Sequence, residues 1–146
     1  MIAQIILCSD GSGHALKAAE IAGEIAAKFQ AEITLLSVFS PAPMPITSPE
    51  GLAPYVEIDT YERMCEDFHE AVQQNTGMVL DKLGAKYSAR REYGQPVNRI
   101  VETAKDLKAD MIVIGSRGLG GFQRLLLGSV SDGVVHHAHC PVLIVR

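Results

Sequence analysis

Hydrophobic positions along the chain fall into short unbroken runs that alternate with segments of helical periodicity. The stretches "IAQIILCSD" and "EITLLSVFS" are continuous apolar runs, as expected of strands that are covered on both faces. Between them, "GHALKAAEIAGEIAAKFQ" gathers its apolar residues near one helical face and its charged residues elsewhere. The pattern predicts a strand, a helix and a second strand.

The alternation resumes after one interruption. Residues 41–57 hold five of the seven prolines, which excludes a helix or an interior strand and predicts a long surface loop. The pattern then predicts a long helix from about Ile58 to Leu83, a polar edge strand over 86–94 and a helix that begins at Pro96. After these, it predicts a buried strand over 110–115, a short helix from Ser129 or shortly after, and a last strand in "PVLIVR".

This order of elements predicts the fold class. Alternating strands and helices favour right-handed crossovers, and hence an α/β fold built on a single doubly wound parallel sheet of five strands with helices on both faces, Rossmann-like in type. We expect one domain over residues 1–146. Because ligands bind at the carboxyl ends of the strands in such sheets, Asp10 and Gly115, which follow two buried strands, are candidates for one site.

Composition and charge limit the function classes. The chain of 146 residues is 47% hydrophobic and 21% charged, the balance of a soluble globular protein. Its net charge of −4 argues against a nucleic-acid or anionic-membrane partner, since both require a basic surface. The N-terminal segment lacks the basic region of a signal peptide, so we expect a cytoplasmic protein without membrane insertion. The widely spaced Cys8, Cys65 and Cys140 predict reduced, mostly buried thiols.

A glycine-rich stretch, "GSRGLGGFQRLLLGSVSD", lies between a predicted strand and a predicted helix at residues 115–132. Its spacing, Gly115-x2-Gly118-x9-Gly128-Ser129, can wrap a polyphosphate, because glycines allow a close approach of the backbone and a helix start offers amide donors. The helix-start donors would come from residues 128–131, with the hydroxyls of Ser129 and Ser131 added. The stretch has no lysine for a P-loop, and ordinary turn chemistry is the alternative.

Five charged or titratable residues near this stretch have two interpretations each. Arg117 and Arg124 lie within the loop and could screen phosphate charge, or could be solvated surface arginines. His136, His137 and His139 resemble a metal cluster in composition. However, they point to different sides of one helix with no carboxylate at ligand spacing, so we favour a structural role for them.

The chain resembles the universal stress protein family in its nucleotide-binding branch. The family's Gly-x2-Gly-x9-Gly-Ser/Thr motif matches Gly115, Gly118, Gly128 and Ser129, and the resemblance extends to "IILCSDGSGHALKAAEIA" and "HCPVLIVR". It implies an adenine nucleotide alpha hydrolase-like fold that binds ATP, or AMP or ADP, with Mg²⁺ or Mn²⁺ carried on the phosphates. It also implies a regulatory stress-response role, a regulatory protein partner and a homodimer formed through the C-terminal strand.

The resemblance further implies roles for single residues. Asp10 would accept hydrogen bonds from the ribose hydroxyls, and Val38 would line the adenine pocket with Cys8 and Ile114 packed nearby. Gly115 would lie beside the ribose and the α-phosphate. The phosphates would be held by Gly118, Gly128, Ser129, Val130 and Ser131.

Two of these residues also have simpler explanations, and one position departs from the family pattern. Asp10 before Gly11 and Ser12 could cap a turn or the first helix, and Val38 could be an ordinary core residue. Ser9 stands where family members more often carry alanine or valine, which changes the local polarity.

Two function classes follow from the sequence. The first is an ATP-binding regulatory protein whose nucleotide-dependent surface is offered to partners. The second is a slow ATPase or nucleotidyl-transfer enzyme that uses the same loop, although beyond Asp10 the motif supplies no fixed acid, base or lysine. A partner-binding domain with an empty pocket is a third possibility, against which the glycine motif argues. The apolar last strand would lie at a sheet edge, where a homodimer would cover it.

Overall fold

Five parallel strands form the central layer of the protein in a computed structural model, which describes residues 1–40, 58–118 and 127–146. The strands are β1 (Gln4–Cys8), β2 (Glu32–Phe39), β3 (Tyr87–Tyr93), β4 (Met111–Gly115) and β5 (Val142–Val145). They lie in the order β3-β2-β1-β4-β5, and every neighbouring pair is parallel. The predicted doubly wound sheet is confirmed, with the polar strand β3 and the apolar strand β5 at its two edges.

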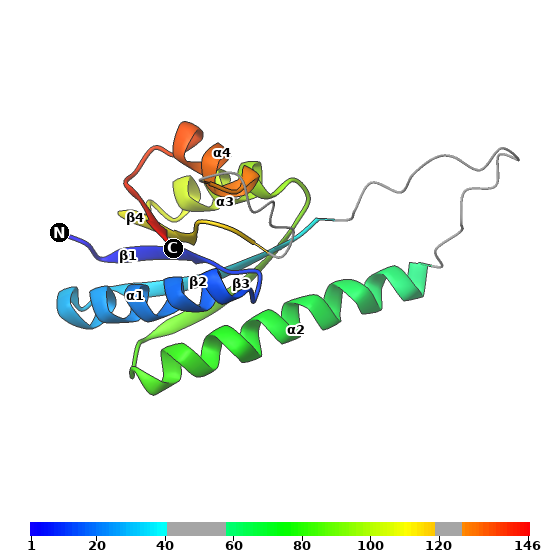
Figure 1. Ribbon diagram of the computed structural model, residues 1–146, viewed down its shortest axis with the longest axis horizontal. Helices are drawn as coiled ribbons and strands as arrows, with labels where there is room; N and C mark the ends of the chain where they lie inside the picture. Colours follow the sequence, from blue (N-terminus) through cyan, green and yellow to red (C-terminus); the bar gives the residue numbers. More distant parts are fainter. Residues whose placement is uncertain (41–57, 119–126) are drawn as a thin grey trace, which may run out of the picture.

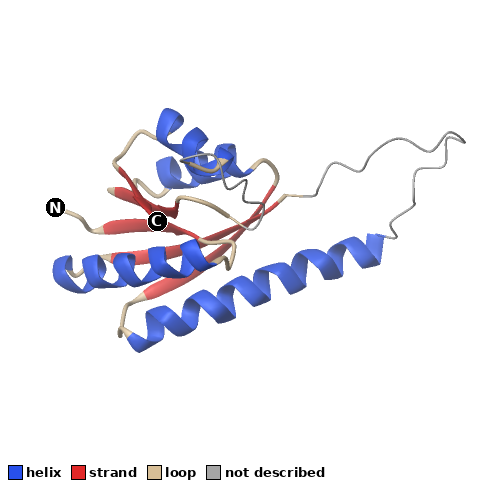
Figure 2. Ribbon diagram, viewed as in Figure 1, coloured by secondary structure: helices blue, strands red, loops and turns tan. Residues whose placement is uncertain are grey.

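In the described part of the chain, four helices cover the two faces of this sheet (Figures 1 and 2). α1 and α2 lie on one face, and α3 and α4 lie on the other. Their bounds are α1 (Gly13–Phe29), α2 (Ile58–Lys82), α3 (Pro96–Asp106) and α4 (Ser129–His137). The predicted starts of α2, α3 and α4 are confirmed, whereas the proline-rich stretch 41–57 lies outside the described residues. No described helix is both long and apolar enough to cross a membrane.

The unbroken apolar runs arise because the central strand is covered on both sides. Ile5 and Leu7 of β1 pack in the cluster beneath α1 and α2, whereas Ile6 and Cys8 pack in the cluster beneath α3 and α4. All three cysteines are free thiols. Cys8 and Cys65 are buried and Cys140 is half-buried, as predicted.

Two buried side-chain hydrogen bonds connect α2 to the sheet. His69 Nδ1 lies 2.6 Å from Ser37 Oγ of β2, and Thr76 Oγ1 lies 2.7 Å from Ser9 Oγ at the end of β1. All four side chains are buried. Their spacing of seven residues along α2 places His69 and Thr76 on the same face of the helix, toward the carboxyl edge of the sheet.

His69 has an unusual environment for a titratable group. Its ring lies among those of Phe39, Phe68 and Tyr93, at centroid distances of 6.5, 5.3 and 5.2 Å. Nε2 has no hydrogen-bond partner among the described residues. Burial, with a smaller contribution from the Arg91 guanidinium, lowers the pKa of His69 below its usual value, while the Glu66 carboxylate partly opposes this.

We therefore expect acid to destabilise the protein through His69. Its pKa is lower in the folded than in the unfolded protein, so the unfolded state binds the proton more readily, and stability falls as the pH drops below about 6.5. One proton limits this slope to about 1.4 kcal/mol per pH unit. Urea unfolding of the wild type and of His69→Gln, whose amide can still pair with Ser37, measures how the free energy of unfolding depends on pH. Equal pH dependence of the two proteins between pH 7 and 5 would contradict the expectation.

Candidate functional site

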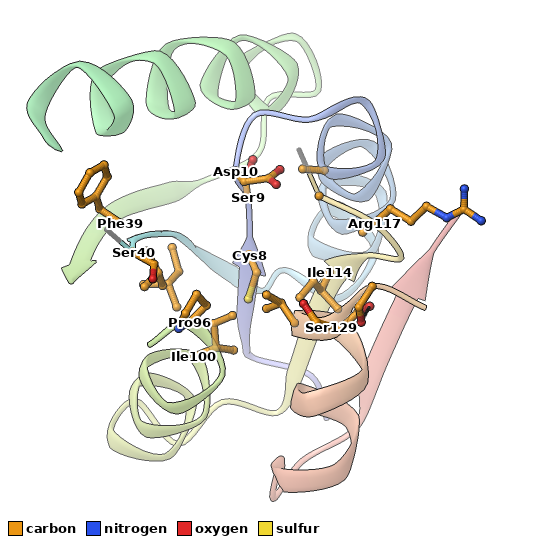
Figure 3. A pocket seen from close by; sticks show the side chains of 18 of the residues that line it. Cys8, Ser9, Asp10, Phe39, Ser40, Pro96, Ile100, Ile114, Arg117 and Ser129 are labelled. Atoms are coloured by element: carbon orange, nitrogen blue, oxygen red, sulfur yellow. Dashed lines mark hydrogen bonds between the residues drawn. The ribbon is translucent and has the colours of Figure 1, made fainter. Parts of the chain in front are cut away.

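A cavity of about 520 Å³ opens at the carboxyl ends of β1, β2 and β4, beside the first turns of α3 and α4 (Figure 3). Its position is the switch point of the sheet, where the strand order reverses between β1 and β4. Its volume lies within the range of small-molecule sites. Every residue predicted for the site lines this one cavity: Cys8, Asp10, Val38, Ile114, Gly115, Arg117, Gly118, Gly128, Ser129, Val130 and Ser131. Arg124 lies outside the described residues.

One part of the cavity is apolar. Cys8, Val38 and Ile114, predicted from the resemblance, are joined there by residues that the sequence did not suggest: Leu36, Phe39, Phe68, Pro96 and Ile100. Pro96 and Ile100 stand one turn apart at the start of α3, and both point toward the cavity in Figure 3. Burial raises the pKa of the Cys8 thiol, with a smaller contribution from Cys140, so Cys8 stays protonated and packs as a small apolar group.

Asp10 stands in a tight turn between β1 and α1. Its Oδ1 accepts a hydrogen bond from the Ser12 amide at 3.0 Å, and Gly11 adopts a left-handed conformation with φ of 79°. Ser12, and not Asp10, is the N-cap of α1, because its side chain accepts from the Ala15 amide at 3.3 Å. The capping explanation for Asp10 therefore holds for the turn and not for the helix.

The first turn of α4 lines the cavity with amides that have no hydrogen-bond partner among the described residues. The first hydrogen bond along the helix runs from the Asp132 amide to the Gly128 carbonyl at 3.0 Å. The amides of Ser129, Val130 and Ser131 precede it, and the N-cap Gly128 supplies no side-chain bond. A helix start of this kind combines N–H donors with the positive end of the helix dipole, which favours an anion.

The backbone of Ser116 ties this helix start to the rest of the sheet. The Ser116 carbonyl accepts from the Gly128 amide at 2.6 Å and from the Ser131 hydroxyl at 3.0 Å. On its other side, the Ser116 amide donates to the Val145 carbonyl of β5 at 2.7 Å. The Ser131 hydroxyl also lies 3.0 Å from the Gly128 carbonyl. Its single proton is thus directed at loop carbonyls, and a bond from this hydroxyl to phosphate stays a prediction.

A side chain added at each of the three motif glycines would contact a different neighbour. A Cβ on Gly115 would lie 2.8 Å from the carbonyl carbon of His14, so the absence of a side chain here allows α1 to pack on β4, and Gly115 also lines the cavity. Its place beside the ribose and the α-phosphate stays a prediction. A side chain on Gly118 would run into Oδ2 of Asp10. A Cβ on Gly128 would lie 3.2 Å from the Ser116 carbonyl oxygen.

The charged side chains of the cavity are Asp10 and Arg117, among the described residues that line it. The Arg117 guanidinium points away from the cavity in Figure 3, whereas its backbone carbonyl lies 3.5 Å from the Ser12 hydroxyl. Neutral donors therefore dominate the end of the cavity at α4. Screening of phosphate charge by Arg117 stays a prediction.

Two of the three C-terminal histidines, His136 and His137, lie in the last turn of α4 and contact carbonyl oxygens of that helix. His136 Nδ1 lies 2.8 Å from the Asp132 carbonyl oxygen, and His137 Nδ1 lies 2.8 Å from that of Gly133. The Asp132 carboxylate lies 3.7 Å from His136, one helical turn away. Within the described ranges, no three His, Cys, Asp or Glu side chains are grouped as metal ligands.

The fold and the cavity define a class, that of Rossmann-like α/β proteins with a ligand-sized pocket at the switch point of the sheet. The chain belongs to the universal stress protein family, whose model matches residues 1–146. A universal stress protein of Methanocaldococcus jannaschii is 37% identical over 98% of this chain and 81% of its own length. One from Thermus aquaticus is 34% identical over the full length of both proteins. A solved universal stress protein in complex with cAMP is 28% identical and covers 99% of this chain and 97% of its own, with a TM-score of 0.71.

Proposed function

We propose that this protein binds an adenine nucleotide in the cavity and acts as an ATP-binding regulatory protein of the stress response. The observation that carries the proposal is the presence, in one cavity, of an apolar wall, the Asp10 carboxylate and the amides at the start of α4. These match the base, the ribose and the phosphates of a nucleotide in turn. The relative solved with cAMP supports the adenine nucleotide class.

In this proposal the base packs against the apolar wall that includes Val38 and Ile114, and Asp10 accepts from the ribose hydroxyls. The amides of Ser129, Val130 and Ser131 hold the phosphates. The described lining offers a divalent cation one carboxylate only, that of Asp10. Mg²⁺ or Mn²⁺ would thus be held chiefly by the phosphates and would keep several waters. ATP is the proposed ligand, with AMP and ADP as the alternatives.

Regulation through binding fits the charges of the cavity better than turnover does. Phosphoryl transfer needs positioned cations and a group that orients the nucleophile. Among the described lining residues, Asp10 is the one acid, and in this proposal it is held by the ribose. Steady-state turnover of Mg-ATP at about one per second would favour the slow ATPase or nucleotidyl-transfer alternative.

We expect Asp10→Ala to weaken ATP and adenosine to the same extent, by about 10-fold to 100-fold, because the ribose is common to both and hydrogen bonds to a charged group contribute about 1.5–3 kcal/mol. Calorimetric titration of both ligands measures this. Glu20→Ala, which removes an exposed carboxylate on α1, is the control for the loss of one negative charge. The proposed function fails if the wild-type protein binds neither ligand. The role of Asp10 fails if the variant loses affinity for ATP alone.

A further inference from the structure

We infer that the buried hydroxyl pair Ser9–Thr76 positions the Asp10 carboxylate, so that a residue of α2 governs how strongly the cavity distinguishes ribose from dideoxyribose. This inference rests on the proposed function, because it assigns a positioning device to the proposed ribose contact. Thr76 itself does not line the cavity and acts only through Ser9.

Ser9 connects α2 to the turn that carries Asp10. Its hydroxyl oxygen lies 2.7 Å from Thr76 Oγ1 and accepts from the Gly11 amide at 3.1 Å. Its own amide donates to the Leu36 carbonyl of β2 at 3.0 Å, which fixes its backbone to the neighbouring strand. Ser9 and Thr76 are 6% and 0% exposed, so neither hydroxyl can exchange these partners freely for bulk water.

The turn is thereby held on both sides of Asp10. The Gly11 amide is bound by Ser9, and the Ser12 amide is bound by Asp10 Oδ1 at 3.0 Å. With Oδ1 directed into the turn, Oδ2 lies on the side of Gly118, where the loop after β4 begins. Figure 3 shows the Asp10 carboxylate at the rim of the cavity, next to Ser9. Loss of the Ser9 hydroxyl frees the Gly11 amide and loosens the turn that aims this carboxylate.

Thr76 completes the arrangement because Ser9 and Thr76 each have a single hydroxyl proton. The Ser9 oxygen already accepts from Gly11, and Thr76 either receives the Ser9 proton or donates its own. Replacement of Thr76 by valine keeps the volume but leaves the Ser9 hydroxyl without its partner on α2. The hydroxyl can then rotate away from the Gly11 amide.

The Ser37–His69 pair provides a matched control. It joins the same helix to the neighbouring strand through a buried serine, at 2.6 Å, but neither residue bonds to the turn that carries Asp10. A variant at Ser37 therefore disturbs the docking of α2 without altering the support of Asp10.

The test compares the affinities of the full-length protein for ATP and 2′,3′-dideoxyATP, which lacks both ribose hydroxyls. We expect Ser9→Ala and Thr76→Val each to lower the ratio of the two dissociation constants by about threefold to tenfold, the effect of one lost neutral hydrogen bond. The double variant should lower it no further than one single variant. Thr76→Ser, which restores the hydroxyl, and Ser37→Ala should leave the ratio unchanged.

The variant Asp10→Ala distinguishes a failure of the positioning role of Ser9 and Thr76 from a failure of the proposed ribose contact. If it abolishes the discrimination while Ser9→Ala and Thr76→Val preserve it, the proposed function stands and the positioning role is overturned. If Asp10→Ala leaves the discrimination intact, the ribose contact itself is wrong.

Amide hydrogen exchange in the ligand-free protein tests the positioning without any nucleotide. The Gly11 and Ser12 amides should exchange faster in Ser9→Ala and Thr76→Val than in Ser37→Ala. Equal exchange of these amides in all three variants would overturn the inference.

Discussion

Gly128→Val is expected to weaken ATP binding by at least about 100-fold while adenosine binding changes by less than about threefold. A Cβ at this position lies 3.2 Å from the Ser116 carbonyl oxygen, and the branched valine side chain forces the start of α4 away from the loop. The three amides that follow Gly128 then lose their common direction. Two hydrogen bonds to a charged phosphate, at about 1.5–3 kcal/mol each, account for a loss of this size. Calorimetric titration with both ligands measures it.

Gly118 cannot replace Gly128 in this experiment. A side chain on Gly118 runs into Asp10, so Gly118→Val should weaken adenosine as well as ATP. Gly13→Ala is the control, because a Cβ at that position meets no atom within 4 Å. If Gly128→Val reduces adenosine affinity as much as ATP affinity, the loop is structural and the phosphate-cradle interpretation of the glycine-rich stretch is wrong.

Ile144→Pro is expected to convert a homodimer into a monomer. We propose that the dimer forms through β5, an edge strand of four apolar residues. The carbonyls of Pro141 and Val145 accept from the amides of Ile112 in β4 and of Ser116 directly after it, at 2.9 and 2.7 Å. Backbone groups alternate in direction along a strand, so those of Val142 and Ile144 face away from the sheet and are available to a second copy. Proline at 144 removes one outward amide and leaves the bonds to β4 in place.

The variant Ile144→Ala separates the effect of the lost side-chain contacts from the effect of the lost backbone amide. Ile144 packs against the cluster beneath α3 and α4, so either substitution removes apolar contacts and lowers the free energy of unfolding. Only proline also removes the amide. Sedimentation at micromolar concentration should find a dimer for the wild type and Ile144→Ala and a folded monomer for Ile144→Pro. A folded Ile144→Pro that remains dimeric would show that the proposed seam is elsewhere.

The fold could be predicted because each element carries its own local signal. The apolar run of β1 is unbroken since Ile5 and Ile6 face opposite covered sides of the sheet. Pro96 marks the first turn of α3, where its missing amide is not needed. The mixed polarity of β3 indicated an edge strand, and the sheet order confirms it.

The site was predictable in part. The glycine spacing led to residues of β4 and α4, and these line the cavity together with Asp10. Phe68 of α2 and Phe39 of β2 were missed, because no local pattern brings a helix and a strand end from distant parts of the chain to one wall. The packing role of Gly115 beside α1 was missed for a related reason. A glycine that accommodates a packed helix and one that accommodates a ligand look the same in a sequence.

The backbone of Ser116 links the start of α4 directly to the end of β5. The Ser116 carbonyl accepts from the Gly128 amide at the start of α4, and the Ser116 amide donates to the Val145 carbonyl at the end of β5, so one residue connects the proposed phosphate cradle to the proposed subunit seam. If phosphate binding displaces Ser116, the edge strand moves with it, and subunit assembly becomes energetically linked to nucleotide occupancy. Thermodynamic linkage then requires the reverse as well: assembly must alter the affinity for nucleotide by the same factor. Under this proposal, a change of bound nucleotide is read out as a change in quaternary structure.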